Sequence, residues 1–498
     1  MYIGLDIGTS GSKADLIDEN GKVHGSGQVN YNFSNTANGF RELDAQNVWE
    51  AVKKCLSDAA SGKKVDTITV SCFGEAIVLV DQYGNPIGPG ITGTDIRGID
   101  ELREITKEFG VRKLTDITGL NLSIIYSANK ILWIRKHQPD IYRKANKILT
   151  FQDYIIYCLC HEAMIDYSMA SRTLLFDINK QEWSDCILSW SGIAREKLAK
   201  PVPSGTVAGT LKCDVAKELN LSADTKIVVG THDHICNAIG SGVCEVGSCV
   251  DTVGTTEGLT AVLNRSTLNP DNIERYQISC EPFAVKGLYN TVAWNNTSGV
   301  LLKWFVNEMV KEEEPEKIIS TFSEMNRQMN AVPTDLFVLP HFSGSATPYM
   351  DSFSKGAILG LTLDTKRIDI YKALMEGANY ELAVILEALQ RSGLRVGRLV
   401  ATGGALSQEL LQIKADILGI PVRTVKNRQT GTLGGAILGT VTIGIYHSVK
   451  EAIKNMVRED RIYIPDNVNT EIYREKFAVY KKIYPAIAEI SHKMTKRG

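Results

Sequence analysis

The chain has 498 residues, of which 44% are hydrophobic and 22% are charged, and its formal net charge is −2 at pH 7. This balance is ordinary for a globular protein, and the length exceeds what one compact core holds, so two large domains are expected. No basic tail and no block of lysine and arginine is present, so nothing favours nucleic acid as a partner.

The N-terminal segment lacks the pattern of a secretory signal, because the carboxylate of Asp6 comes early and no basic region precedes it. No run of about 18 apolar residues occurs, so a membrane span is not expected. The ten cysteines are scattered, and the spacing of Cys158 and Cys160 fits neither a zinc site nor a thioredoxin motif. These patterns predict a cytoplasmic protein with reduced thiols and no membrane partner.

Strands and helices are expected to alternate along the chain, which predicts an α/β protein. The opening segment has apolar stretches on both sides of a glycine- and serine-rich turn, a pattern typical of two strands with a tight connection. The expected elements, in chain order, are strands over 2–6, 13–18 and 23–31, a helix over 43–60, strands over 67–70 and 78–80, a turn over 81–86, a helix over 127–137, a strand over 226–230 and a helix over 235–242.

The opening pattern recurs near the middle of the chain. Residues 248–260 run from a strand through a Gly-Thr-Thr turn into a second strand, as residues 3–11 do through a Gly-Thr-Ser turn. This degenerate repeat predicts two related domains, 1–246 and 247–498, with a ligand-binding cleft between them. The alternative is that such turns recur by chance in an α/β chain with 42 glycines.

The first turn has the composition of a phosphate-binding loop. Glycines such as Gly8 let backbone amides approach a ligand closely, and the hydroxyls of Thr9 and Ser10 add donors. Lys13 supplies a cation for phosphate, and Asp6 stands at the end of the first strand, where a carboxylate can hold Mg²⁺ directly or through water. A tight hairpin with a solvated aspartate is an alternative of about equal weight.

A second glycine-rich segment, Gly403-Gly404-Ala405, follows an expected strand over 398–401 and opens a helix with apolar residues at helical spacing. Glycines at a helix N-terminus let a flat or anionic ligand touch the backbone, although a plain strand-to-helix turn has the same composition. The glycines over 430–436 are interpreted as close helix packing. Neither a Walker motif nor a Rossmann fingerprint occurs, so a nucleotide would bind through another scaffold.

Two of the eight histidines of the chain, His232 and His234, flank Asp233, and three interpretations compete. A metal site needs more ligands, for which Cys236 is the one further candidate nearby. A polar turn with satisfied hydrogen bonds is a common structural alternative. A catalytic carboxylate is the third, because a hydroxyl group that attacks a phosphoryl group needs an acceptor for its proton.

Charged residues at two other places suit a polyhydroxylated ligand. Asp95 and Arg97 follow a loop rich in proline and glycine, and together they offer acceptors and a rigid fork of donors. An exposed surface ion pair is the commoner alternative. Glu75 follows an apolar strand, and it either faces a cleft or caps a turn.

These motifs occur in the order found in one family. The chain resembles the FGGY carbohydrate kinases, which include glycerol, xylulose, fuculose and gluconate kinases, over nearly its whole length. The segment from Asp6 to Lys13 looks like the first phosphate motif of that family, and Gly254-Thr255-Thr256 looks like the second. Gly403-Gly404-Ala405 with Gln408 looks like its adenosine segment. Family signatures are also resembled by residues 127–137, 166–171 and 344–351.

The resemblance implies the actin/hexokinase/Hsp70-type ATPase fold, with two ribonuclease H-like domains around a central cleft. It implies Mg²⁺-ATP across the cleft, a small sugar or polyol bound mainly by the N-terminal domain, and Asp233 as the general base for a primary hydroxyl group. It is compatible with a homodimer. The implied ATP- and phosphate-binding residues are Gly8, Thr9, Ser10, Lys13, Gly254, Thr255, Thr256, Gly403, Gly404, Ala405 and Gln408. The implied acceptor-binding residues are Glu75, Asp95, Arg97, His232 and His234, and the implied metal-binding residues are Asp6 and Asp233.

The sequence does not identify which sugar or polyol is the acceptor. Xylulose kinases usually carry Gln-Met-His-Gly where this chain has residues 73–76, which speaks against xylulose. The Phe-Gly pair there and Thr231-His232-Asp233 are closer to fuculose-type kinases, whereas Glu75 falls where glycerol kinases have an acceptor-binding glutamate. A short ketose, deoxy-ketose or polyol is expected.

Two alternatives to a kinase are an ATPase-fold regulator without catalysis and a sugar-binding regulator. The first would not need Asp233, Glu75 or the pair Asp95 and Arg97. The second would be expected to have damaged phosphate turns, and both turns are intact. A C-terminal helix is expected over 471–490, docked on its own domain.

Overall fold

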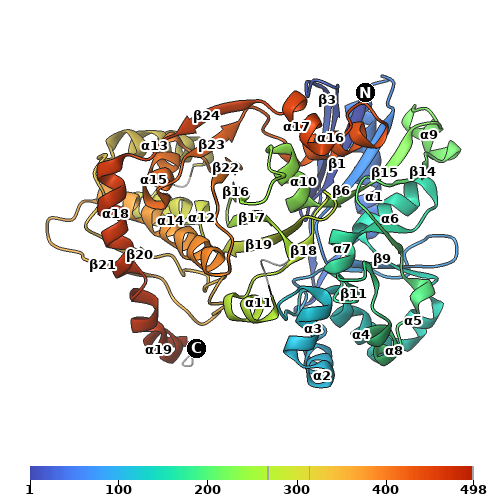
Figure 1. Ribbon diagram of the computed structural model, residues 1–498, viewed down its shortest axis with the longest axis horizontal. Coiled ribbons are helices and arrows are strands. Elements are labelled where there is room, and N and C mark those ends of the chain that lie inside the picture. Colours follow the sequence, from blue (N-terminus) through green and yellow to red (C-terminus); the bar gives the residue numbers. More distant parts are fainter. Residues whose placement is uncertain (37, 266–268, 313, 496–498) are drawn as a thin grey trace.

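The computed structural model describes residues 1–36, 38–265, 269–312 and 314–495. Two large mixed sheets dominate the fold, and helices pack around each of them (Figure 1). The expected α/β class is therefore confirmed. In spatial order, the strands of the first sheet are β14 (Val207–Thr210), β15 (Lys226–His232), β6 (Thr67–Cys72), β1 (Tyr2–Ile7), β2 (Gly11–Ile17) and β3 (Val23–Asn30).

The second sheet repeats the strand pairing of the first. β1 is antiparallel to β2 and parallel to β6, as β16 is antiparallel to β17 and parallel to β22. The sequence repeat is therefore a repeat of topology, and each Gly-Thr turn joins the first antiparallel pair of its sheet. The strands of the second sheet, in spatial order, are β18 (Glu281–Pro282), β19 (Tyr289–Asn295), β17 (Glu257–Leu263), β16 (Ser248–Val253), β22 (Arg398–Thr402), β23 (Val422–Val425) and β24 (Glu459–Tyr463).

Two helices connect the halves. α10 (Asp233–Gly240) packs closely on α16 (Thr430–Thr442), and α16 also packs on β1 and β6 of the first sheet. In Figure 1, α16, which comes late in the chain, lies beside the strands that begin the chain. A Cβ atom on Gly434 would lie 1.9 Å from the carbonyl oxygen of Cys236, and one on Gly4 would lie 1.8 Å from that of Thr432. The glycines over 430–436 therefore serve close helix packing, as expected. The domain boundary near residue 246 stays a prediction.

Most of the expected helices form with small shifts of their ends. α1 (Ala45–Ala60) begins after Asp44, whose side chain accepts from the amides of Gln46 and Asn47, and α4 (Ser127–His137) has the expected bounds. The single C-terminal helix over 471–490 is wrong, because the chain forms two helices, α18 (Asn467–Tyr480) and α19 (Ile483–Thr495). α18 does dock on its own half, where it packs against α15 (Gln408–Leu418).

Further elements complete the two halves. A smaller sheet in the first half contains β4 (Ser34–Asn35), β5 (Arg41–Leu43), β8 (Gly90–Ile91), β7 (Ile77–Val80) and β9 (Lys147–Thr150). Short two-stranded pairs are β10 (Met164–Asp166) with β13 (Lys200–Val202), β11 (Phe176–Asp177) with β12 (Glu182–Trp183), and β20 (Phe337–Leu339) with β21 (Ala357–Leu359). The other α-helices are α2 (Ile99–Phe109), α3 (Val111–Thr118), α5 (Pro139–Lys144), α6 (Phe151–Cys160), α7 (Tyr167–Ser171), α8 (Asp185–Ser191), α9 (Cys213–Leu219), α11 (Pro270–Tyr276), α12 (Gly299–Phe305), α13 (Pro315–Gln328), α14 (Arg367–Arg391) and α17 (Val449–Met456). None of the helices described here is long and apolar enough to cross a bilayer.

Candidate active site

Asp6 lies at the carboxyl end of β1, directly before the first turn. Its neighbours in register are Ser71 on the parallel strand β6 and Lys13 on the antiparallel strand β2. Its Oδ1 atom is buried and has no hydrogen-bond partner among the described residues. Burial, reinforced by the negative charge of Asp233, raises the pKa of Asp6 to about 7. An unpartnered carboxylate oxygen at this place fits a cation ligand better than a structural group.

Asp233 is the first residue of α10 and directly follows β15. Its negative charge acts on Asp6. Its Oδ1 accepts a hydrogen bond from the backbone N–H of His234, with 2.7 Å between the atoms. Burial raises the pKa of Asp233 to about 6, although this hydrogen bond and the charge of Arg172 oppose the shift. The carboxylate is therefore basic enough to accept a proton near neutral pH, as a general base must.

The two histidines beside Asp233 are electrically neutral groups. Burial, with the positive charge of Arg172, lowers the pKa of His234 to about 4 and that of His232 well below its usual value. The Nε2 atom of His232 lies 3.3 Å from Oδ1 of Asp233, and its Nδ1 has no partner among the described residues. His234 faces the second half, since a Cβ atom on Gly258 of β17 would lie 3.4 Å from its ring.

The two Gly-Thr turns present exposed hydroxyl groups. Thr9 and Ser10 are exposed between β1 and β2, and Thr255 and Thr256 are exposed between β16 and β17. Gly254 donates its N–H to the carbonyl of Thr256, at 2.9 Å between nitrogen and oxygen, which closes the second turn. Both turns thus combine a tight backbone with exposed hydroxyl groups, which suits phosphate oxygens.

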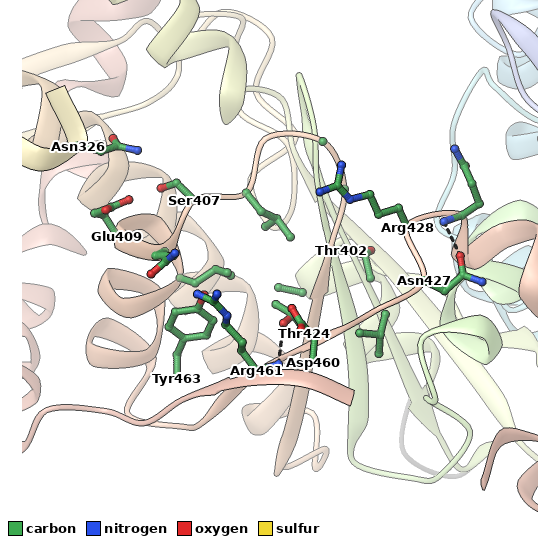
Figure 2. A pocket seen from close by; sticks show the side chains of 18 of the residues that line it. Asn326, Thr402, Ser407, Glu409, Thr424, Asn427, Arg428, Asp460, Arg461 and Tyr463 are labelled. Carbon is green, nitrogen blue, oxygen red and sulfur yellow. Dashed lines mark hydrogen bonds between the residues drawn. The ribbon is translucent and has the colours of Figure 1, made fainter. Parts of the chain in front are cut away.

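A large cavity of about 960 Å³ lies beside the second sheet, at the start of α15 (Figure 2). Gly403, Gly404 and Gln408 line it, and Lys13 reaches it from the first half, where its Nζ donates to Gln429 Oε1 at 3.3 Å. Ala405 is not among the lining residues. The cavity wall also carries cationic side chains, which suit an anionic ligand: Arg327, Arg428 and Arg461.

The two glycines of this cavity have different roles. Gly403 has a φ of +110°, and a Cβ atom there would lie 2.2 Å from the carbonyl oxygen of Val253, so the backbone excludes a side chain. At Gly404 a Cβ atom would meet no atom within 4 Å, so this position opens into the cavity. Ser407 caps α15 by accepting from the amide of Leu410 at 3.1 Å.

The sequence prediction missed two residues of the cluster around Asp233. Arg172 follows α7, and its Nε donates to Oε1 of Glu75 at 2.5 Å, while its Nη1 lies 2.8 Å from Oε1 of Glu281 on β18. Glu75 is therefore not a free acceptor-binding group, since it shares a guanidinium with a carboxylate of the second sheet. No local motif marks Arg172 or Glu281, and the only signal would have been the buried charge of Glu75, which requires a partner.

Asp95 and Arg97 are also engaged with other groups. Nε and Nη2 of Arg97 both donate to the carboxylate of Asp95, at 2.8 and 2.7 Å, and Arg97 also pairs with Glu42 at 3.0 Å. Asp95 is fully buried and Arg97 is 5% exposed, so the exposed ion pair considered from the sequence is wrong. Lys130 is buried beneath them and donates to both of their carbonyl oxygens.

No group of three or more His, Cys, Asp or Glu side chains placed to hold a metal ion occurs within the described ranges. Asp6 and Asp233 stand instead at the carboxyl ends of β1 and β15, which are both parallel to β6, so the two residues lie at the same edge of the first sheet. Two carboxylates fit Mg²⁺, which keeps several waters and takes few protein ligands.

Comparisons with known proteins identify relatives over nearly the whole chain. Residues 1–240 match the FGGY family of carbohydrate kinases, N-terminal domain, and residues 252–443 match the FGGY family of carbohydrate kinases, C-terminal domain. The xylulose kinase of Staphylococcus epidermidis is 27% identical, over 99% of this chain and 98% of its own. The L-xylulose/3-keto-L-gulonate kinase of Escherichia coli is 26% identical over 98% and 97%, and the gluconokinase of Bacillus subtilis is 25% identical over 96% and 94%.

Solved structures share the fold. The ligand-bound xylulose kinase of Lactobacillus acidophilus superposes with a TM-score of 0.90 at 24% identity, covering 99% of both chains. The glycerol kinase of Plasmodium falciparum with ADP gives a TM-score of 0.86 at 20% identity, covering 97% of both. The expected two-domain actin-like ATPase fold is therefore confirmed.

Proposed function

The chain belongs to the FGGY family of carbohydrate kinases, and we propose that it transfers the γ-phosphoryl group of ATP to a primary hydroxyl group of a small sugar or polyol, with Asp233 as general base. The observation that carries this proposal is the placement of Asp6 at the end of β1 and of Asp233 directly after β15, at the same edge of the first sheet as the first hydroxyl-bearing turn. The names of its relatives span neutral ketoses and gluconate, so family membership leaves the acceptor open.

On the donor side, the cavity at α15 is proposed to take the adenosine part of ATP. Gly404 opens into it, and the absence of a side chain there leaves room for a flat base against the backbone. The phosphates are proposed to meet the amides and hydroxyls of the two turns and the ammonium group of Lys13. Lys13 is suited to this role because it already lies at the cavity wall.

On the acceptor side, Asp233 is proposed to orient the attacking hydroxyl group and to take its proton as the new O–P bond forms. Its raised pKa of about 6 places most molecules in the ionised, basic form at pH 7. The leaving oxygen of ADP carries away the negative charge, and the positive charge of Lys13 and the turn amides stabilise the transferring group.

Asp6 and Asp233 are proposed to hold Mg²⁺. The buried and unpartnered Oδ1 of Asp6 supports this, because such an oxygen is costly unless a ligand meets it. When bound, Mg²⁺ supplies positive charge to the phosphoryl oxygens. Asp6 is proposed to act in its ionised form, which the charge of a bound cation would favour over the protonated form that burial favours.

The experiment measures ADP formation from Mg²⁺-ATP with a panel of ketoses, deoxy-ketoses, polyols and aldonates, and identifies the product by phosphorus and carbon NMR. The proposal predicts that one acceptor class stimulates ADP formation and carries the phosphate on a primary hydroxyl group. ADP formation that no acceptor stimulates, although ATP binds, would contradict it and favour a regulator instead. A cytoplasmic location and a homodimer stay predictions.

A further inference from the structure

The acceptor side of the proposed site contains a three-part ion cluster that joins the halves of the chain: Glu75, Arg172 and Glu281. The Arg172 guanidinium uses Nε and Nη2 toward Glu75 and Nη1 toward Glu281. The side chains of Arg172 and Glu75 are 11% and 12% exposed, and that of Glu281 is 0% exposed. The cluster is therefore well shielded from water, and its charges act strongly on a ligand beside it.

The cluster borders Asp233. A Cβ atom on Gly74 would lie 2.7 Å from Nε of Arg172 and 3.0 Å from Nε2 of His232, and the same His232 nitrogen lies 3.3 Å from Asp233 Oδ1. The charge of Arg172 reaches Asp233, and the charges of Glu281 and Asp233 both reach Glu75. An acceptor whose hydroxyl group meets Asp233 therefore lies in the field of this cluster.

The charge balance of the cluster disfavours an anionic acceptor. The guanidinium is shared by two carboxylates, and Asp233 adds a third negative charge nearby. A carboxylate acceptor would have to displace Glu75 or Glu281 from Arg172, which would leave a buried carboxylate without its partner. It would also lie beside Asp233, and like charges repel strongly at such a place.

A neutral polyhydroxylated acceptor meets complementary groups instead. Oε2 of Glu281 is buried and has no hydrogen-bond partner among the described residues, so a hydroxyl group that reaches it would pair an otherwise unsatisfied acceptor. The contacts of Arg172 leave N–H groups on Nη1 and Nη2, which can donate to a hydroxyl oxygen. Hydroxyl groups satisfy both without displacing either ion pair.

We propose that the cluster Glu75, Arg172 and Glu281 makes this kinase selective for uncharged polyhydroxylated acceptors and rejects those that carry a carboxylate. This inference rests on the proposed kinase function, and it separates this chain from relatives whose names include gluconate and 3-keto-L-gulonate. Arg172 and Glu281 are specificity-determining residues in this account.

The test compares matched acceptors that differ in one carboxylate, such as glucitol with gluconate and xylitol with xylonate, alongside the preferred neutral acceptor. The wild type is expected to show kcat/KM at least about 100-fold higher for the neutral class. In Glu281→Gln, which removes one negative charge and keeps the side-chain shape, this ratio is expected to fall at least about tenfold.

Asp271→Asn is the matched control. Asp271 also joins the two halves, through a 2.8 Å ion pair with Arg112, but both of these side chains are exposed whereas the cluster is buried. The control is expected to leave the ratio unchanged. Glu75→Gln provides a second variant with the same charge change, and melting curves establish that each variant is folded.

A carboxylate acceptor with the higher kcat/KM would overturn the inference while the kinase function stands. A ratio that Glu281→Gln and Glu75→Gln both leave unchanged would overturn the role of the cluster. Calorimetric titration of the same acceptor pairs without ATP tests the proposed selectivity separately from the proposed kinase function. Binding of the neutral member alone supports the selectivity even if no transfer occurs, and binding of the aldonate or of neither member overturns it.

Discussion

Lys13, on the second strand of the first sheet, donates from Nζ to Oε1 of Gln429, which directly precedes α16 in the wall of the large cavity, at 3.3 Å. The contact joins residues 416 positions apart in sequence. It places the cation of the first turn beside the cavity of the second half, and so connects the two parts of the proposed ATP site.

Replacement of Lys13 by methionine is expected to raise KM for ATP and lower kcat, together reducing kcat/KM for ATP by about 100-fold, because a charge-assisted contact to phosphate is lost. Steady-state kinetics with varied ATP measure the change. Lys64→Met is the control, since Lys64 is 84% exposed outside the site. Equal reductions of kcat/KM for ATP in Lys13→Met and Lys64→Met would show that Lys13 contributes only to the overall charge of the protein and makes no specific contact with ATP.

Gly404→Leu is expected to raise KM for ATP at least about tenfold without destabilising the protein, because the new side chain fills cavity space. A Cβ atom at this position meets no neighbour within 4 Å. KM for the sugar acceptor should change little, since the cavity is proposed for adenosine. Weaker acceptor binding at unchanged KM for ATP would place the nucleotide elsewhere.

The rate is expected to depend on pH through the Asp6 and Asp233 pair. The pKa values are raised to about 7 for Asp6 and about 6 for Asp233, and both groups act in the deprotonated form. kcat/KM should therefore rise with pH and level off above neutrality, with an acid limb that belongs to the interacting pair. A profile measured at subsaturating Mg²⁺, where the cation does not hold the carboxylates ionised, that stays flat down to pH 5 would show that neither carboxylate must be ionised.

The packing of α10 on α16 is expected to tolerate no side chain at Gly434. A Cβ atom there would lie 1.9 Å from the carbonyl oxygen of Cys236, so Gly434→Ala should destabilise the protein by at least about 2 kcal/mol. Gly397→Ala is the matched control, because Gly397 is exposed with no atom within 4 Å, and it should change stability by less than about 0.5 kcal/mol. Denaturant unfolding measures both, and a neutral Gly434→Ala would contradict the packing account.

Much of the fold was predictable because its signals are local. The Gly-Thr turns, the apolar strands beside them and the helix over 127–137 each depend on a short segment. The split of the C-terminal helix was missed, because aromatic residues keep a nearly helical spacing through the break between Tyr480 and Ile483.

The cluster around Asp233 was predictable only in part. Asp6 and Asp233 stand at strand ends within recognisable motifs. Arg172 and Glu281 instead form an ion pair between residues 109 positions apart, which no local pattern predicts. The same limit applies to Asp95 and Arg97, whose pairing the sequence suggested but whose burial and contacts with the more distant Lys130 it did not.

The most direct test of the central claim is the rate of acceptor phosphorylation by Asp233→Asn, measured beside ATP binding and thermal unfolding of the same variant. The account predicts a fall in kcat of about 1,000-fold, because asparagine keeps the shape but cannot take the proton. The folded structure should be retained, and so should ATP affinity measured without Mg²⁺, because the proposed nucleotide contacts lie at Lys13, the two turns and the cavity at α15. A variant that keeps wild-type kcat while folded and saturated with ATP would show that Asp233 is not the base.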